Sequence, residues 1–323
     1  MSDRAPLLEV EGLRMHFFTR EGVVKAVDDV SFRVERGRVL GLVGESGSGK
    51  SMTGYSVMGL VDPPGRVVSG RIMLDGTDLG ALDEEARRNL RGGRIAMIFQ
   101  DPMMTLNPVL RIDTQMVEAV LAHQRVSRAS ALERSREALA RVGIPSPAER
   151  LRSYPHEFSG GMRQRVAIAI AMLNRPDLII ADEPTTALDV TVQGQILSQM
   201  QALCRESGAG LIWITHDLSV IAGLADDVCV MYAGRIVESG PVDEVLDRPM
   251  HPYTRGLIDS VPSRNTPGRP LAQIRGMAPS PFSLDGGCAF RERCSRAIES
   301  CRVAPAPIAP AAHRTLRCVN PAT

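Results

Sequence analysis

Apolar residues along the chain fall into short runs that are separated by longer amphipathic stretches. Residues 7–17 and 23–34 are rich in β-branched and other apolar side chains and flank a short TREG segment, which predicts two β-strands joined by a turn. Residues 177–182 (DLIIAD) and 210–215 (GLIWIT) are continuous apolar runs, the pattern of strands that are covered on both faces. Since strand patterns of this kind alternate with helical ones, the chain predicts a parallel α/β sheet.

Further segments predict elements of the same fold. Residues 38–44 (RVLGLVG) have a strand pattern that runs into a glycine-rich loop, and residues 50–60 then have a helical pattern. Residues 94–100 (RIAMIFQ) predict another strand, and the period is helical from about 113 to 141. After about residue 261 the chain is rich in Pro, Gly and Ser, which predicts a linker or an irregular extension.

The bulk composition argues against several classes of partner. The net charge is +1 and aromatic residues make up 4%, so neither a basic surface for nucleic acid nor a base-stacking platform is expected. No run approaches 18 consecutive apolar residues, so we do not expect the chain to cross a membrane by itself. The first residues, MSDRAPLLEVEG, lack a basic and then apolar leader, which favours a cytoplasmic protein.

Residues 44–51, GESGSGKS, match a phosphate-binding loop that stands between a predicted strand and a predicted helix. Glycine lets the backbone take positive φ and approach a phosphate closely, and the helix N-terminus then faces the negative charge. The alternative is a glycine-rich turn that binds no ligand. The candidate phosphate-binding residues are Gly44, Ser46, Gly47, Ser48, Gly49, Lys50 and Ser51.

Two other segments add candidate chemistry. The apolar run 178–181 is followed by Asp182 and Glu183. Asp182 can hold Mg²⁺, and Glu183 can polarise an attacking water. Two acidic residues where a strand meets a loop are also common without any such role. Residues 158–165, FSGGMRQR, form a second turn that opens onto a helix and can bind an anion. One nucleotide does not need two such sites, unless one of them serves the nucleotide of another subunit.

These segments together resemble those of the ATP-binding-cassette (ABC) ATPases, over about residues 7–260. GESGSGKS is similar to the Walker A motif, LIIADE to Walker B and FSGGM to the signature motif. The resemblance implies an α/β fold with a P-loop RecA-like core, an antiparallel β subdomain and a helical subdomain at about 101–172. It implies a nucleotide-binding domain at 1–260, and a small irregular, cysteine-rich extension at 261–323.

The resemblance also implies roles for single residues. Gln100 in IFQDP is similar to the Q-loop glutamine and His216 in WITHD to the switch histidine, so the implied catalytic residues are Glu183, His216 and Gln100. Phe17 stands where the family stacks an aromatic ring on adenine, with Phe18 as the alternative. The implied ATP-binding residues are Phe17, Gly44, Ser46, Gly47, Ser48, Gly49, Lys50, Ser51, Gln100 and His216, and the implied Mg²⁺ ligands are Ser51, Gln100 and Asp182.

In this family two cassettes pair head to tail, and each ATP lies between the Walker A of one and the signature of the other. Ser159, Gly160 and Gly161 are therefore implied to contact the ATP of a partner subunit. Residues 186–189 (TALD) resemble the D-loop, whose aspartate is Asp189. Met162 replaces the signature glutamine, but the serine and the glycines make the phosphate contacts, so we expect the signature to function.

Three segments indicate a branch of the family. FSGGMRQRV, IFQDPMMTLNPV and HPYTRGLIDSVP (251–262) resemble the oligopeptide/dipeptide permease ATPases, a branch that also holds nickel importers. This implies an ATP-hydrolysing motor for di- or oligopeptide import, peripheral on the cytoplasmic face of the inner membrane. The implied partners are a second ATPase subunit in a heterodimer, two membrane permeases that dock on the helical segment, and an extracytoplasmic solute-binding protein. Nickel, glutathione or another small solute, or a soluble ABC ATPase outside transport, are the alternatives.

The extension carries cysteines in the spacing C-x5-C-x6-C-x16-C. Disulfides are disfavoured in a reducing cytoplasm, and free thiols are a second possibility. A metal site is the third, although zinc prefers closer paired cysteines than these. The resemblance implies a [4Fe–4S] cluster, with zinc left open, on Cys288, Cys294, Cys301 and Cys318. Cys204 and Cys229 are predicted to be packing residues.

Overall fold

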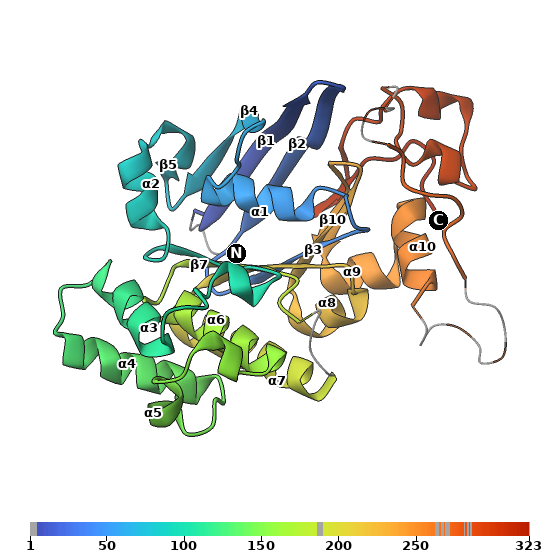
Figure 1. The fold of residues 1–323 in the computed structure, drawn as a ribbon. Coiled ribbons are helices and arrows are strands. Elements are labelled where there is room, and N and C mark those ends of the chain that lie inside the picture. The colour runs from blue at the N-terminus through green and yellow to red at the C-terminus, as the bar shows by residue number, and fades with distance from the viewer. Residues whose placement is uncertain are drawn as a thin grey trace. The chain divides into compact units, whose positions relative to one another are not determined.

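The computed structural model describes residues 5–185, 190–261, 265, 268, 272–280, 282, 284 and 286–322 (Figure 1). The chain divides into two compact units. Unit 1 takes in residues 1–34, 39–80 and 213–323, and unit 2 takes in residues 35–38 and 81–212. In the described part of the chain, no helix has both the length and the hydropathy that crossing a bilayer requires.

Unit 1 contains an antiparallel sheet with the strand order β2-β1-β4-β5. Its strands are β1 (Leu8–Thr19), β2 (Gly22–Val34), β4 (Gly65–Leu74) and β5 (Thr77–Asp78). β1 and β2 pair from Leu8 opposite Val34 to Thr19 opposite Gly22, which confirms the predicted strands and the turn between them. β4 was not predicted, because most of its residues are exposed and give no clear alternation.

A second group of strands in unit 1 has the order β11-β12-β10-β9-β3. β3 (Val39–Val43) is parallel to β9 (Asp227–Tyr232), and β10 (Arg235–Pro241) is antiparallel to β9. The extension adds β11 (Ile308–Ala311) and β12 (Arg314–Leu316), with Leu316 opposite Glu238 of β10. The extension is therefore partly regular where the sequence predicts an irregular segment. Among the described residues, the helices of unit 1 are α1 (Lys50–Met58), α8 (Leu218–Leu224), α9 (Val242–Asp247), α10 (Pro252–Asp259), η5 (Arg291–Arg293) and η6 (Glu299–Arg302). The 3-10 helix η1 (Leu79–Ala81) lies across the boundary between the two units.

Unit 2 contains the parallel strands β6 (Ile95–Ile98) and β7 (Leu178–Asp182), and every residue of both strands is buried. The predicted helical stretch at 113–141 is two helices, α3 (Ile112–Leu121) and α4 (Arg128–Arg141). The two helices are separated by a short segment whose last residue, Ser127, is the N-cap of α4. The Ser127 Oγ accepts a hydrogen bond from the main-chain N–H of Ser130 at 3.2 Å. The remaining helices are α2 (Glu84–Leu90), η2 (Pro102–Met104), α5 (Pro147–Arg150), η3 (Pro155–Glu157), α6 (Gly160–Met172) and α7 (Val190–Ser207), and β8 (Gly210–Thr215) crosses the boundary between the units.

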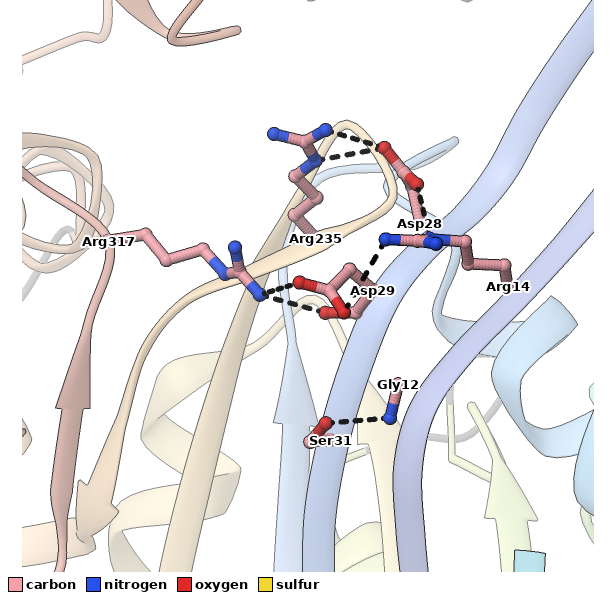
Figure 2. Close-up of polar contacts among 7 residues, drawn as sticks. All are labelled: Gly12, Arg14, Asp28, Asp29, Ser31, Arg235 and Arg317. Carbon is pink, nitrogen blue, oxygen red and sulfur yellow. Dashed lines mark hydrogen bonds and ion pairs between the residues drawn. The ribbon is translucent and has the colours of Figure 1, made fainter. Parts of the chain in front are cut away.

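An acidic pair on β2 connects three segments of unit 1 (Figure 2). Asp28 accepts from Arg235 Nη2 at 2.6 Å and lies 3.3 Å from Arg14 Nε. Asp29 accepts from Arg317 of the extension at 2.7 Å. Burial of the Asp28 carboxylate by itself raises its pKa. The hydrogen bond from Arg235 and the positive charges of Arg235, Lys25 and Arg14 lower the pKa by more than burial raises it. The pKa of Asp28 is therefore below its ordinary value, and the charged form is the one that the fold stabilises.

Candidate functional site

The phosphate loop follows β3, whose five residues are all buried, and its last two residues, Lys50 and Ser51, begin α1. Gly44, Gly47 and Gly49 have φ of 154°, 78° and 101°, respectively. A Cβ at Gly44 would lie 2.2 Å from the carbonyl oxygen of Met231, and one at Gly49 would lie 2.3 Å from that of Ala26. Both positions therefore require glycine for space as well as for conformation, as the sequence indicates for a loop that brings its backbone close to a ligand.

Lys50 is 5% exposed and turns back onto its own loop. Its Nζ donates to the carbonyl oxygens of Gly44 at 2.8 Å and Glu45 at 3.0 Å. The Oγ of Ser48 is buried and has no hydrogen-bond partner among the described residues. An anion at this loop would meet an ammonium group, a hydroxyl and the main-chain N–H groups at the start of a helix, which is the arrangement that binds phosphate.

The two candidate adenine-stacking rings differ in their surroundings. Phe17 is half-buried, and a Cβ on Gly65 would lie 2.8 Å from its ring, so the glycine leaves room for it. Phe18 is 39% exposed, and the guanidinium of Arg66 lies 4.2 Å from its ring centre. One face of Phe18 is thus already covered by a cation. The stacking role of Phe17 stays a prediction.

In unit 2, the parallel register of β6 and β7 brings Gln100 and Glu183 together. Ile98 pairs with Ala181, so the residues that follow both strands leave the sheet at the same edge. Gln100 Nε2 donates to Glu183 Oε2 at 3.3 Å. Asp182 is 1% exposed, and Glu183 has a φ of 43°, an uncommon conformation for a residue with a side chain. A glutamine therefore holds the predicted catalytic carboxylate, and their use in hydrolysis stays a prediction.

The predicted signature residues are at the start of α6, a helix of 13 residues. Ser159 caps the helix, because its Oγ accepts from the main-chain N–H of Met162 at 3.3 Å. Ser159 and Gly160 are exposed, and no heavy atom lies within 4 Å of a Cβ built on Gly160. This helix start can accept an anion from outside unit 2.

His216 belongs to unit 1 and follows directly after β8, where it is exposed. The next residue, Asp217, caps α8 through a hydrogen bond from the N–H of Ser219 at 2.8 Å. Residues 186–189, which include the predicted D-loop residue Asp189, lie outside the described residues.

All four cysteines of the extension line one small pocket. The N–H of Cys288 donates to the carbonyl oxygen of Cys301 at 2.9 Å, which joins two of the segments, and all four are free thiols. Burial raises the pKa of the thiols of Cys288, Cys294 and Cys318. Over the described residues, no group of three or more His, Cys, Asp and Glu side chains is arranged to hold a metal ion.

Cys204 and Cys229 are buried, and burial raises the pKa of each to about 12. These thiols are therefore protonated and inert near neutral pH, in agreement with a packing role.

Sequence reasoning missed one contact of the phosphate loop. The carboxylate of Glu45 is bound by Arg293, which follows it by 248 positions. An acidic residue inside a loop that must attract phosphate is the one local signal that could have drawn attention to Glu45. Nothing local identifies its partner.

Comparison with known proteins adds two family matches. Residues 27–186 match the family described as ABC transporter. Residues 237–301 match the family described as oligopeptide/dipeptide transporter, C-terminal region.

Curated relatives match nearly the whole chain. A putative peptide import ATP-binding protein of Brucella abortus is 50% identical over 98% of this chain and 98% of its own. The oligopeptide transport ATP-binding protein OppD of Salmonella typhimurium is 47% identical over 98% of this chain and 94% of its own. The dipeptide transport ATP-binding protein DppD of Bacillus subtilis is 46% identical over 97% and 94%, respectively.

Solved structures share the fold. A dimeric bacterial ABC transporter cassette covers 73% of this chain and 98% of its own, with a TM-score of 0.67 and 25% identity. The cbiO1 protein of Clostridium perfringens, part of the ABC transporter complex cbiONQ, covers 76% and 92%, with a TM-score of 0.64 and 26% identity. The fold predicted from the motifs is confirmed by these likenesses.

Proposed function

Because the chain belongs to the ATP-binding subunits of ABC transporters for oligopeptides and dipeptides, we propose that its ATP hydrolysis drives the import of di- or oligopeptides. The observation that carries this conclusion is the 50% identity with a putative peptide import protein over 98% of both chains. That similarity takes in the phosphate loop and the cysteine-rich end alike. The chain is an ATPase of the transport type, and the site geometry supports the roles proposed below.

The hydrolytic chemistry is assigned to residues of both units. Lys50 would exchange the carbonyl oxygens that it now contacts for the β- and γ-phosphate oxygens of ATP. Glu183 would accept a proton from the attacking water, and Gln100 would orient that carboxylate through the hydrogen bond described above. His216 would contact the γ-phosphate, as the family resemblance implies.

Mg²⁺ fits the donors available in each unit. The Ser51 hydroxyl is in the first turn of α1, and Asp182 is an almost fully buried carboxylate at the end of a strand. Hydroxyl and carboxylate oxygens are the ligands that Mg²⁺ prefers, and Gln100 would add an amide oxygen. When bound, the ion neutralises charge on the phosphates during transfer to water.

Ser159, Gly160 and Gly161 would act on the ATP of a second ATPase subunit. The support is that their helix start is exposed and open, and that one nucleotide does not use two phosphate-binding helix starts. We propose a heterodimer, in which a different ATPase subunit provides the second cassette. Asp189 would lie at the same dimer contact.

The membrane partners would be two permease subunits, with an extracytoplasmic solute-binding protein that delivers the cargo. The segment after Gln100 supports a docking role, because Met104 is 65% exposed and Val109 is 75% exposed. Exposed apolar residues of this kind mark contact surfaces when they gather in one place. The subunit would then be peripheral on the cytoplasmic face of the inner membrane.

The cysteines of the extension would hold a [4Fe–4S] cluster. The support is that four thiols of the extension line one pocket, and four thiolates are the donor set that such a cluster uses. Iron and acid-labile sulfide in anaerobically purified protein, absent from a Cys301→Ser variant, are the expected result. Stoichiometric zinc without sulfide would contradict the cluster.

The transport function is tested by purifying the tagged chain from detergent-solubilised membranes under anaerobic conditions and identifying every chain that co-purifies. Two multi-span permeases and a second cassette ATPase are expected, and the solute-binding protein that works with them then allows a direct cargo assay. Uptake of labelled dipeptides and longer peptides is compared with that of nickel and glutathione. Soluble partners without a permease would overturn the transport function and favour an ABC ATPase outside transport.

A further inference from the structure

The extension contacts the phosphate loop through the side chain of one loop residue, Glu45. The carboxylate of Glu45 accepts two hydrogen bonds from Arg293, from Nη1 to Oε2 at 2.8 Å and from Nη2 to Oε1 at 3.0 Å. The main-chain N–H of the same glutamate donates to the hydroxyl of Tyr253 at 2.9 Å. A two-point pair between a guanidinium and a carboxylate fixes orientation as well as distance, so Glu45 is held at both its main chain and its side chain.

Arg293 is itself fixed. Its side chain is 7% exposed, and its Nε donates to the carbonyl oxygen of Arg275 at 3.0 Å. Its Nη1 also donates to the hydroxyl of Tyr232 at 3.2 Å. The hydrogen bond to Glu45 raises the pKa of Arg293 further above its ordinary value. The guanidinium therefore stays charged and has little freedom to turn away from the loop.

The aromatic side chains around this pair make it part of a packed cluster. Phe290, three residues before Arg293, is 4% exposed. Its ring centre lies 5.3 Å from that of Tyr232 on β9 and 5.4 Å from that of Tyr253 on α10. Edge-to-face contacts at these distances stabilise the cluster beyond simple burial. The extension is therefore packed onto β9 and α10, close to the phosphate loop; Figure 1 shows it beside α10.

Glu45 also contacts the lysine that defines the loop. Lys50 Nζ donates to the carbonyl oxygens of Gly44 and Glu45, so the main chain of Glu45 forms part of the resting position of that ammonium group. Arg293, Glu45 and Lys50 thus form a continuous line of contacts, from the extension to the charge that meets the phosphates.

The extension also shares a pocket with the loop, at residues other than Arg293. One pocket of unit 1 is lined by Ser46, Gly47 and Ser48 of the phosphate loop, and by Ala278, Pro279 and Leu284 of the extension. The extension therefore borders the loop on the side of these residues as well as at Glu45.

We propose that Arg293 is a positioning residue for the phosphate loop, so that the affinity for ATP depends on the C-terminal extension. Arg293 holds Glu45, and Glu45 holds the first part of the loop and the resting Lys50 in the geometry that receives phosphate. Losing the pair frees the loop, and ATP binding must then order it at the expense of affinity. The proposal requires nucleotide binding only, and neither the cargo nor a group on the cysteines enters it.

The competing explanation is that the pair merely attaches the extension to the rest of unit 1. Arg317 offers a matched control, because it is another arginine of the extension and donates to Asp29 Oδ2 at 2.7 Å and to the Asp29 carbonyl oxygen at 3.0 Å (Figure 2). Its side chain contacts β2, and none of the hydrogen bonds or ion pairs of Arg317 among the described residues is with the phosphate loop. Attachment alone would make the two arginines equivalent.

The test measures binding of the β,γ-imido analogue of ATP with Mg²⁺ to the full chain by calorimetry. Arg293→Gln should weaken binding by about tenfold or more, the factor expected when one charge-assisted pair is lost. Arg317→Gln should change it by less than about threefold, within the small effect expected of a distant substitution. Arg293→Lys should recover part of the loss. In steady state, KM for ATP should rise in Arg293→Gln while kcat at saturating ATP changes little.

A double-mutant cycle protects the test against a variant that simply folds poorly. Glu45→Gln removes the same pair from the other side and leaves Arg293 its contacts with Tyr232 and Arg275. The double variant should bind no more weakly than the worse single variant, since both changes remove one interaction. Equal losses in Arg293→Gln and Arg317→Gln, or additive losses in the cycle, would overturn the proposal.

Discussion

Replacing Gly49 by alanine tests whether the phosphate loop has the tight geometry described above. Gly49 has a φ of 101°, and a Cβ there would lie 2.3 Å from the carbonyl oxygen of Ala26 on β2. Placing alanine in a left-handed conformation costs about 1–2 kcal/mol. Forcing an extra methyl group into a filled space costs about 1–3 kcal/mol more, because β2 or the loop must move. We therefore expect Gly49→Ala to lower the free energy of unfolding by about 2–5 kcal/mol, a large part of the stability of an ordinary domain.

Gly47 provides the control for this prediction. Its φ is 78°, but no heavy atom lies within 4 Å of a Cβ built there. Gly47→Ala therefore carries the conformational cost of about 1–2 kcal/mol and no steric cost. Both variants and the wild type are unfolded with urea without nucleotide, so that lost ligand binding does not enter the comparison. If Gly49→Ala is no less stable than Gly47→Ala, the close approach of the loop to β2 is wrong.

Three further predictions address the site and the acidic pair on β2. Glu183→Gln should reduce ATP hydrolysis by about 10²–10⁴-fold, the contribution of a general base, and leave ATP binding intact; turnover near that of the wild type would remove Glu183 from the mechanism. Phe17→Ala should weaken ATP binding by about tenfold through lost stacking. Phe18→Ala should have little effect on ATP binding, because Arg66 covers the Phe18 ring. A calorimetric titration that gave the reverse order would assign the adenine contact to Phe18. Asp28→Asn should lower the free energy of unfolding at pH 7 by more than it does at pH 3. Because the pKa of Asp28 is depressed in the folded state, its stabilising contribution is present above the ordinary value of 3.8 and is lost as the pH falls below that value. Urea midpoints at both pH values check this, and an equal loss at both would be inconsistent with a charged contact.

The elements that could be predicted from the sequence are those whose signal is local. β7 and β8 are continuous apolar runs, and their observed bounds lie within one residue of the predicted ones, since a strand buried on both faces has no polar alternation to obscure it. The phosphate loop could be predicted equally well from the sequence, because its glycines are close together and follow a strand. The helical period at 113–141 was correct in type but concealed the break between Leu121 and Arg128.

What could not be predicted depends on pairs that are distant in the chain. β12 has three residues, too few to show a period, and becomes a strand by pairing with β10. The hydrogen bond between Gln100 and Glu183 follows from the register of β6 and β7, which neither segment encodes alone. Arg293 is one of many arginines in the sequence, and its role became visible only when the fold placed it against Glu45.

Two cysteines of the extension each follow directly after an arginine that binds the rest of unit 1. Arg293 precedes Cys294, and Arg317 precedes Cys318. Consecutive Cα atoms are 3.8 Å apart, so a shift of the main chain at either cysteine also displaces the arginine beside it. Thermodynamic linkage then runs in both directions: if occupancy of the cysteine pocket strengthens ATP binding, ATP must strengthen retention of the occupant by the same factor. The chelator concentration that empties the pocket at equilibrium would accordingly be higher when the nucleotide site is filled.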